Sequence, residues 1–227
     1  MDGVQISRTP FLAGVAPAIE AELRALGVRR RFPAGSAVFI EGDTAHDALL
    51  LLAGTVKITV TALDGKEVLL DVLGVGALVG ELSAIDGHTR SATATALLPV
   101  EVLAVPCVAF IELMHRHPAL MYRLLVSVAN RLRGSVRRQL EYGTGDAMGR
   151  LCGRLMELAD QYGEPGDNGC VELLSPVSQA DLAAWTGLSR EAVVKALRHL
   201  RQLGWIENKG RQITIVQADR MQARAVS

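Results

Sequence analysis

The sequence predicts an α+β protein in which an antiparallel, β-rich part is followed by one long helix and a smaller, mostly helical part. Three observations lead to this prediction. Short apolar runs alternate with glycine-bearing breaks at about ten-residue spacing over residues 31–106. A helical apolar period begins after Pro118, and residues 178–197 contain the signals of two short helices joined by a turn glycine. With 227 residues, of which 49% are hydrophobic, the chain can bury one large core or two small ones.

The first elements follow from these signals in order. Ile19, Leu23 and Leu26 predict a short helix that ends near Gly27. The β-rich part then presents the apolar runs AVFI, ALLLLA, VKITV, EVLLDVL and VEVLAV, which are typical of an antiparallel sandwich or barrel. Within it, TALDGKEV predicts a hairpin whose turn is Asp64-Gly65, a pair that tolerates positive φ.

The long helix has an apolar stripe wider than one small domain can cover. The stripe consists of residues at three- and four-residue steps: Met121, Leu125, Val128, Leu132 and Val136, widened by Leu120 and Leu124. Six arginines occupy the other faces. We therefore expect one part of the helix to pack on its own β-rich part and the other part on a second copy, in a parallel homodimer. The alternative is a monomer whose long helix packs on the last domain.

The long helix is expected to end at the glycines of Tyr142-Gly143-Thr144-Gly145-Asp146, a candidate hinge. Asp146 is a good N-cap for a helix from Ala147 to about Tyr162, and a short strand follows at Val171-Glu172-Leu173. The predicted domains are residues 1–117, the β-rich part; 118–143, the dimerisation helix; and 144–227, the C-terminal part.

Residues 178–197, SQADLAAWTGLSREAVVKAL, predict a helix-turn-helix. Ser178 can cap the first helix, Gly187 supplies the positive φ of the turn, and Ser189 can cap the second helix. The small Ala183 allows the helices to cross closely, and the other inward residues are Leu182, Val193, Ala196 and Leu197. On spacing alone, an ordinary αα-hairpin remains the alternative.

The polar residues left on the second helix suit base edges in a DNA groove. Arg190 can reach guanine O6 and N7, Glu191 can accept from a cytosine amino group, and Lys195 suits guanine or a phosphate. The following GWIENKGRQITIV predicts a hairpin, or wing, whose Lys209 and Arg211 would lie near phosphates. A winged helix-turn-helix is therefore predicted. The alternative for the three helix residues is a solvated charged face.

The net charge is zero, with 24 Lys+Arg and 24 Asp+Glu, but the charges are unevenly distributed. Residues 1–115 hold eight basic and thirteen acidic residues, whereas residues 189–211 hold six basic and two acidic ones. A neutral total therefore does not exclude DNA. It implies that binding depends on a local patch, with less non-specific attraction than a uniformly basic protein has.

Several classes of protein are excluded. The most apolar stretch, Ala94–Met114, contains Pro99, Glu101, Pro106 and Glu112, so no membrane span is expected, and MDGVQISRTP does not resemble a signal peptide. The scattered Cys107, Cys152 and Cys170 suit a reducing cytoplasm and form no metal-spaced cluster. The sequence has no nucleophile elbow, HExxH or P-loop, so we expect no catalytic residues, no metal site and no enzyme.

A second segment, GELSAIDGHTRSATA at residues 80–94, has the residue types of an anion site. Gly80 permits close backbone approach, and the residues after it can form a helical turn with free amides. Glu81 suits a sugar hydroxyl, whereas Arg90 and Ser91 suit a phosphate. The alternative for Arg90 is a surface ion pair with Asp86.

From about residue 9 to residue 222 the chain resembles the CRP/FNR superfamily of bacterial transcription factors. The specific matches are GELSAIDGHTRSA and LSREAVVKAL, together with the order of β-rich part, long helix, hinge and helix-turn-helix. The resemblance implies a cyclic-nucleotide-binding β-roll, which is a double-stranded β-helix or jelly roll, before the dimerisation helix and the winged helix-turn-helix. It also implies cAMP or a related cyclic nucleotide as effector, with no cofactor.

The resemblance assigns roles to individual residues. Glu81 would hold the ribose 2′-hydroxyl and pair with Arg131, and Gly80, Arg90 and Ser91 would hold the cyclic phosphate. The remaining residues implied at the ligand are Leu82, Ser135 and Val136, and those implied at DNA are Ser178, Gln179, Ser189, Arg190, Glu191, Lys195, Lys209 and Arg211. Ser135 retains the hydroxyl that the family uses at the adenine amino group.

Val136 replaces a polar residue that reaches the base from the second subunit in the family, which removes a hydrogen bond worth about 1 kcal/mol. A cyclic dinucleotide, another small effector or ligand-independent action therefore remain as alternatives. Thr89, where a proline often precedes the arginine, is a smaller departure. An iron–sulfur sensor needs four placed cysteines, and His46, His88, His115 and His117 are expected to be surface residues rather than haem ligands.

The implied partners are double-stranded DNA with palindromic TGTGA-like half-sites, a cyclic nucleotide, a second copy of the chain and RNA polymerase, with no membrane. A different class of function, the regulatory cyclic-nucleotide module of an enzyme or channel, is disfavoured. No catalytic or membrane segment accompanies the ligand segment, and the last 80 residues or so already indicate a DNA-binding domain.

Overall fold

The computed structural model describes residues 10–225 and divides into two compact units, Met1–Arg133 and Gly134–Ser227, which are considered separately. The division falls within the long helix α4, Pro118–Thr144. The predicted absence of a signal peptide rests on residues 1–10, nearly all of which lie outside the described residues. Among the described helices, none has the length and apolar character needed to cross a membrane.

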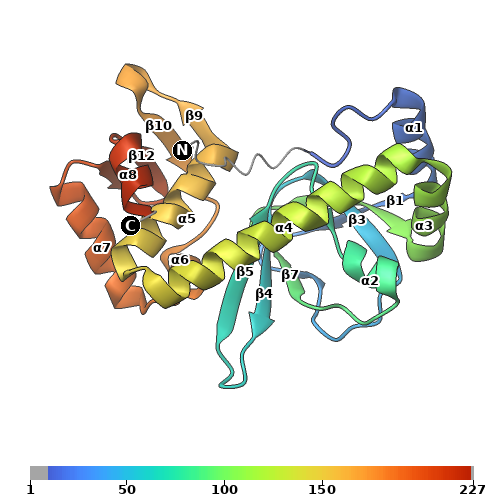
Figure 1. Ribbon diagram of the computed structural model, residues 1–227, viewed down its shortest axis with the longest axis horizontal. Helices are drawn as coiled ribbons and strands as arrows, with labels where there is room; N and C mark the ends of the chain where they lie inside the picture. Colours follow the sequence, from blue (N-terminus) through green and yellow to red (C-terminus); the bar gives the residue numbers. More distant parts are fainter. Residues whose placement is uncertain (1–9, 226–227) are drawn as a thin grey trace. The chain divides into compact units, whose positions relative to one another are not determined.

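The first unit is built on two antiparallel sheets, each with four strands among the described residues (Figure 1). One has the order β1-β8-β3-β6, with bounds Val28–Phe32, Val100–Pro106, Asp47–Ala53 and Leu78–Val79. The other has the order β2-β7-β4-β5, with bounds Ala37–Phe39, Thr93–Ala96, Val56–Thr61 and Glu67–Leu73. The predicted antiparallel arrangement and the β4–β5 hairpin are confirmed.

The core of this unit has two layers because β3 is buried on both faces. Leu49 and Leu51 belong to a cluster shared with strands of the second sheet, whereas Leu50 belongs to a cluster shared with helices. Those helices are α1, Pro17–Leu26, as predicted, α3, Cys107–Arg116, and the start of α4. The sequence did not predict α3, because its apolar residues continue the run of β8 with only Pro106 between them.

Helix α4 has the two apolar faces that its pattern predicts. Leu120 and Leu124 are buried in the core of the first unit. Leu125 and Leu132, which point elsewhere, are each 64% exposed. The helix ends within the predicted segment of residues 142–146: it includes Gly143 and continues to Thr144. A single glycine costs a helix only about 1 kcal/mol, so the following Gly145-Asp146 marks the break instead.

The second unit consists of helices around a small sheet of order β11-β12-β10-β9. The predicted helix α5, Ala147–Tyr162, is capped by the Asp146 side chain, which accepts from the Gly149 N–H. The other elements are β9, Gly163–Pro165; a 3₁₀ turn, Asp167–Gly169; β10, Val171–Leu174; α6, Gln179–Thr186; α7, Arg190–Gln202; β11, Ile206–Lys209; β12, Gln212–Ile215; and α8, Ala218–Ala225. Strand β9 and helix α8 were not predicted.

The last turns of α4 are joined to α5 and α6 by polar contacts within the second unit. The buried Arg154 of α5 lies between Glu141 and Glu157, at 3.0 Å from the latter. The Tyr142 hydroxyl donates to the Trp185 carbonyl at 2.7 Å. Removing one partner of the buried ion pair would leave an uncompensated charge, so these contacts hold the end of α4 against α5 and α6.

Candidate ligand and nucleic-acid sites

The segment predicted to hold an anion begins with a tight turn into α2, Glu81–Asp86. Gly80 has φ of +73°, and a Cβ there would lie 2.3 Å from Nη1 of Arg90. A side chain at this position would therefore be strained and would displace the arginine. This is why a glycine precedes Glu81: it leaves room for the Arg90 guanidinium beside the turn.

Arg90 is buried, with only 4% of its surface exposed, and is held from three directions. Its Nη1 donates to the Gly80 carbonyl at 2.8 Å. Its Nη2 donates to the Asp47 carbonyl at 2.7 Å and to the Asp47 carboxylate at 2.9 Å, and the guanidinium lies 4.5 Å from the centre of the Phe39 ring. The alternative of a surface ion pair with Asp86 is thus wrong. The partner is Asp47, 43 residues earlier in the chain, which the sequence analysis missed.

Glu81 is also buried, with 2% exposed, and its two carboxylate oxygens differ. Oε1 accepts from Arg131 Nη1 at 2.5 Å, which is the pairing that the family resemblance implies, and Arg131 Nη2 also donates to the Leu78 carbonyl. Oε2 has no hydrogen-bond partner within the part of the chain that the structure describes. A buried carboxylate oxygen without a donor is costly, so this atom is suited to a ligand hydroxyl.

The other residues implied at the ligand are not drawn together in this way. Leu82 is on α2 and Ser91 follows Arg90, and both are exposed. Ser135 and Val136 lie four and five residues beyond Arg131 on α4, in the second unit. The Ser135 hydroxyl accepts from Arg138 at 3.2 Å, and Val136 is 50% exposed.

The helix-turn-helix has the predicted local structure. Ser178 caps α6 by accepting from the Asp181 N–H, and the Asp181 side chain completes a capping box that the sequence analysis did not identify. Gly187 ends α6 with φ of +66°, and Ser189 caps α7 by accepting from the Ala192 N–H. The five residues expected to face inward are all buried: Leu182, Ala183, Val193, Ala196 and Leu197. Helices α6 and α7 thus pack through the predicted faces.

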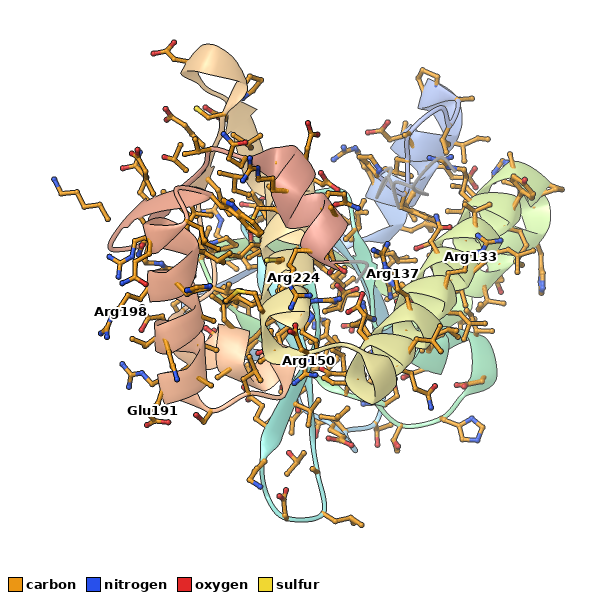
Figure 2. The ribbon with its side chains drawn as sticks, turned by 60° about the vertical axis from the view of Figure 1, so that its left-hand side comes forward. Arg133, Arg137, Arg150, Glu191, Arg198 and Arg224 are labelled. Carbon is orange, nitrogen blue, oxygen red and sulfur yellow. The ribbon has the colours of Figure 1, made fainter. Side chains whose placement is uncertain are left out.

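The solvent face of α7 carries the predicted base-reading residues, Arg190, Glu191 and Lys195, all of them exposed. Figure 2 shows Glu191 and, further along the same helix, Arg198, with their side chains directed away from the ribbon. Hydrogen bonds from its own backbone N–H and from the Ser189 hydroxyl lower the pKa of Glu191. Its carboxylate therefore stays ionised at neutral pH and accepts hydrogen bonds only.

The predicted wing is the β11–β12 hairpin, with exposed Lys209 near its turn. Arg211 has a structural contact that was not expected: it donates to the Ser175 carbonyl at 3.1 Å and also to the Pro176 carbonyl, just before α6. The wing is thereby joined to the start of the helix-turn-helix. Between them lies a notch of about 310 Å³, whose lining includes Ser178, Gln179, Arg190, Asn208, Gly210 and Arg211. The predicted DNA-contacting residues Ser178, Gln179, Arg190 and Arg211 thus share one concave surface.

Comparisons with known proteins agree with this architecture. Residues 29–117 match the family of cyclic nucleotide-binding domains, and residues 149–224 match the Crp-like helix-turn-helix domain. The solved structure of FixK2 from Bradyrhizobium japonicum superposes with a TM-score of 0.80 at 21% identity, covering 88% of this chain and 98% of that one. At that identity the likeness shows the fold alone.

Two curated relatives are closer in sequence. The chain is 30% identical to the CRP-like cAMP-activated global transcriptional regulator of Mycobacterium tuberculosis, over 97% of this chain and 98% of that protein. It is 32% identical to the cyclic AMP receptor protein of Thermus thermophilus, over 86% and 87% of the two chains. These matches cover nearly the whole chain, and both domain families agree with the two parts of the structure. The protein therefore belongs to the CRP/FNR family of transcriptional regulators, with a cyclic nucleotide-binding domain and a Crp-like DNA-binding helix-turn-helix, and is not an enzyme.

Proposed function

We propose that the protein is a cAMP-responsive regulator that binds palindromic, TGTGA-like DNA sites as a homodimer and acts through RNA polymerase in the cytoplasm. Residues 1–117 would bind the nucleotide, residues 118–143 would form the dimer, and residues 144–227 would bind DNA. Nucleotide binding would change the arrangement of the hinge at Gly143–Gly145 and with it the spacing of the two recognition helices.

The buried Glu81–Arg131 pair is the observation that carries the nucleotide proposal. Among the described residues, Glu81 Oε2 has no donor, and a ribose hydroxyl would supply one. A guanidinium has five N–H donors, and within the described part of the chain Arg90 uses three of them on Gly80 and Asp47, which leaves two for a phosphate. A buried hydroxyl acceptor and a buried phosphate donor beside one turn fit a cyclic nucleotide. The printed names of the two curated relatives support cAMP in particular.

Isothermal titration calorimetry with cAMP tests this proposal directly. We expect binding heat with one cAMP per chain, because each chain carries one Glu81 and one Arg90. A cyclic dinucleotide is the comparison ligand, since Val136 removes a polar group at the implied base position. Binding heat with the dinucleotide but not with cAMP would identify a cyclic dinucleotide as the effector in place of cAMP. If neither ligand gives heat and the protein binds its DNA site unaided, ligand-independent action is favoured.

The DNA proposal makes Arg190 a base-reading residue. Replacing Arg190 by alanine is expected to weaken binding to the specific site by about 1–3 kcal/mol and to relax specificity at one base position. The measurement is fluorescence anisotropy on a set of duplexes with single base changes. Arg201→Ala, at the other end of α7, is the control and should weaken all duplexes alike. If Arg190→Ala also weakens every duplex equally, Arg190 contacts a phosphate instead.

A further inference from the structure

Arg30, on the edge strand β1, shares the Asp47 carboxylate with Arg90. Its Nη1 lies 2.8 Å from Asp47 Oδ2, whereas Arg90 occupies Oδ1 at 2.9 Å. The register places both side chains on one face: Arg30 is opposite Val102, and Val102 is opposite Leu51, so Arg30 lies on the same face of the sheet as Leu51, Leu49 and Asp47. The side chain of Arg30 is 54% exposed, and that of Asp47 is 11% exposed.

We propose that Arg30 is a positioning residue that determines, through Asp47, how much positive charge Arg90 offers to an anionic ligand. The proposal deepens the nucleotide site proposed above and rests on it for the identity of the anion. Arg30 contacts Oδ2 of Asp47, whereas Arg90 contacts Oδ1. Arg30 can therefore act through Asp47 without touching the ligand.

Two guanidinium groups share the Asp47 carboxylate. Asp47 and Arg90 alone form a neutral pair, and a neutral buried pair attracts a phosphate weakly. With Arg30 on the second oxygen, the group of three carries a net charge of +1. The carboxylate then also holds Arg90 less strongly, because its charge is divided between two guanidinium groups. Removing Arg30 should therefore tighten the Asp47–Arg90 contact and weaken anion binding.

The same strand offers a matched control: a neighbouring arginine whose side chain lies on the opposite face of the sheet. Arg29 and Arg31 flank Arg30, have side chains that are 66% and 84% exposed, and both pair with Glu101 at 2.8 Å. They lie on the other face of the sheet because side chains alternate along a strand. Arg29→Gln removes the same charge from the same strand without touching Asp47, so it separates a local effect from a general loss of positive charge.

The first test needs no nucleotide. The rate of rotation about the Cζ–Nη bonds of Arg90, measured by nitrogen NMR of the arginine side chains in the full-length protein, reports how tightly Asp47 holds it. Arg30→Gln is expected to slow the rotation at least about twofold, whereas Arg29→Gln should leave it unchanged and Arg30→Lys should largely restore it. Equal rates in the Arg30→Gln and Arg29→Gln variants would overturn the proposal.

The second test is the affinity for cAMP by calorimetry. Arg30→Gln is expected to weaken binding by about 3- to 10-fold, and Arg29→Gln by less than about twofold. In an Asp47→Asn background the effect of Arg30→Gln should largely disappear, because the carboxylate that connects the two arginines is gone. A full effect in that background would mean that Arg30 acts on the ligand directly. Absence of cAMP binding by the unaltered protein would instead count against the proposed effector, while the NMR result would still decide the role of Arg30.

Discussion

Replacing Arg90 by glutamine is expected to lower the affinity for cAMP at least about 100-fold, because it removes the buried cation from the proposed phosphate site. The loss should exceed that of a single hydrogen bond for a second reason. Asp47, which accepts from Arg90 at 2.9 Å, would keep its negative charge beside the incoming phosphate. Calorimetry with the variant and the unaltered protein measures the effect.

Two controls separate this effect from unfolding and from charge alone. Arg24→Gln removes an exposed arginine that pairs with Glu20 within α1, and it should leave cAMP affinity unchanged. Arg90→Gln combined with Asp47→Asn also removes the buried carboxylate, which would otherwise keep only Arg30 as its partner. This double variant should recover part of the stability, as measured by urea unfolding, but not the affinity. If Arg90→Gln binds cAMP within about threefold of the unaltered protein, the phosphate is held elsewhere.

Local chemistry explains why so much of the second unit could be predicted from sequence. Ser178, Gly187 and Ser189 each act on backbone groups within three or four residues, so their positions predict where α6 and α7 begin and end. The inward face of α7 follows from its helical period in the same way. For the first unit, alternating apolar runs and glycine-bearing turns predict antiparallel strands.

The features that the sequence analysis missed depend on contacts between distant residues. Arg90 was expected either to bind an anion or to pair with nearby Asp86, yet its carboxylate partner is Asp47, at the start of a buried strand. An aspartate leading into the run ALLLLA is a signal, since a buried carboxylate needs a partner, but it does not identify which one. Strand β9 exists only because its three residues pair with β10.

Helix α8 is another feature that depends on contacts between distant residues. Met221 is fully buried against α5, where its sulfur lies 3.7 Å from that of Cys152. Arg224 pairs with Asp146, the residue that caps α5. The eight residues of α8 include only one large apolar side chain, Met221, so the helix is stabilised by tertiary packing more than by its sequence pattern.

Introducing charge into the exposed apolar face of α4 is expected to abolish the proposed homodimer. Leu125 and Leu132 are each 64% exposed and lie two turns apart, so they present one continuous face with Val136 and Leu140. Replacing both leucines by glutamate would place four like-charged carboxylates in a two-fold contact. We expect the dissociation constant of the dimer, measured by sedimentation equilibrium, to increase at least about 100-fold. Specific DNA binding should be lost in parallel.

Leu174→Glu is the matched control for this variant. Leu174 is 74% exposed, but it belongs to β10 and not to α4, so the same change there should leave the dimer intact. The buried Leu120 and Leu124 are not altered, and the circular dichroism and thermal unfolding of the first unit should therefore be preserved. A double variant that still sediments as a dimer would show that the exposed stripe of α4 is not the dimer contact. If the unaltered protein also sediments as a single chain, the alternative of a monomer is favoured.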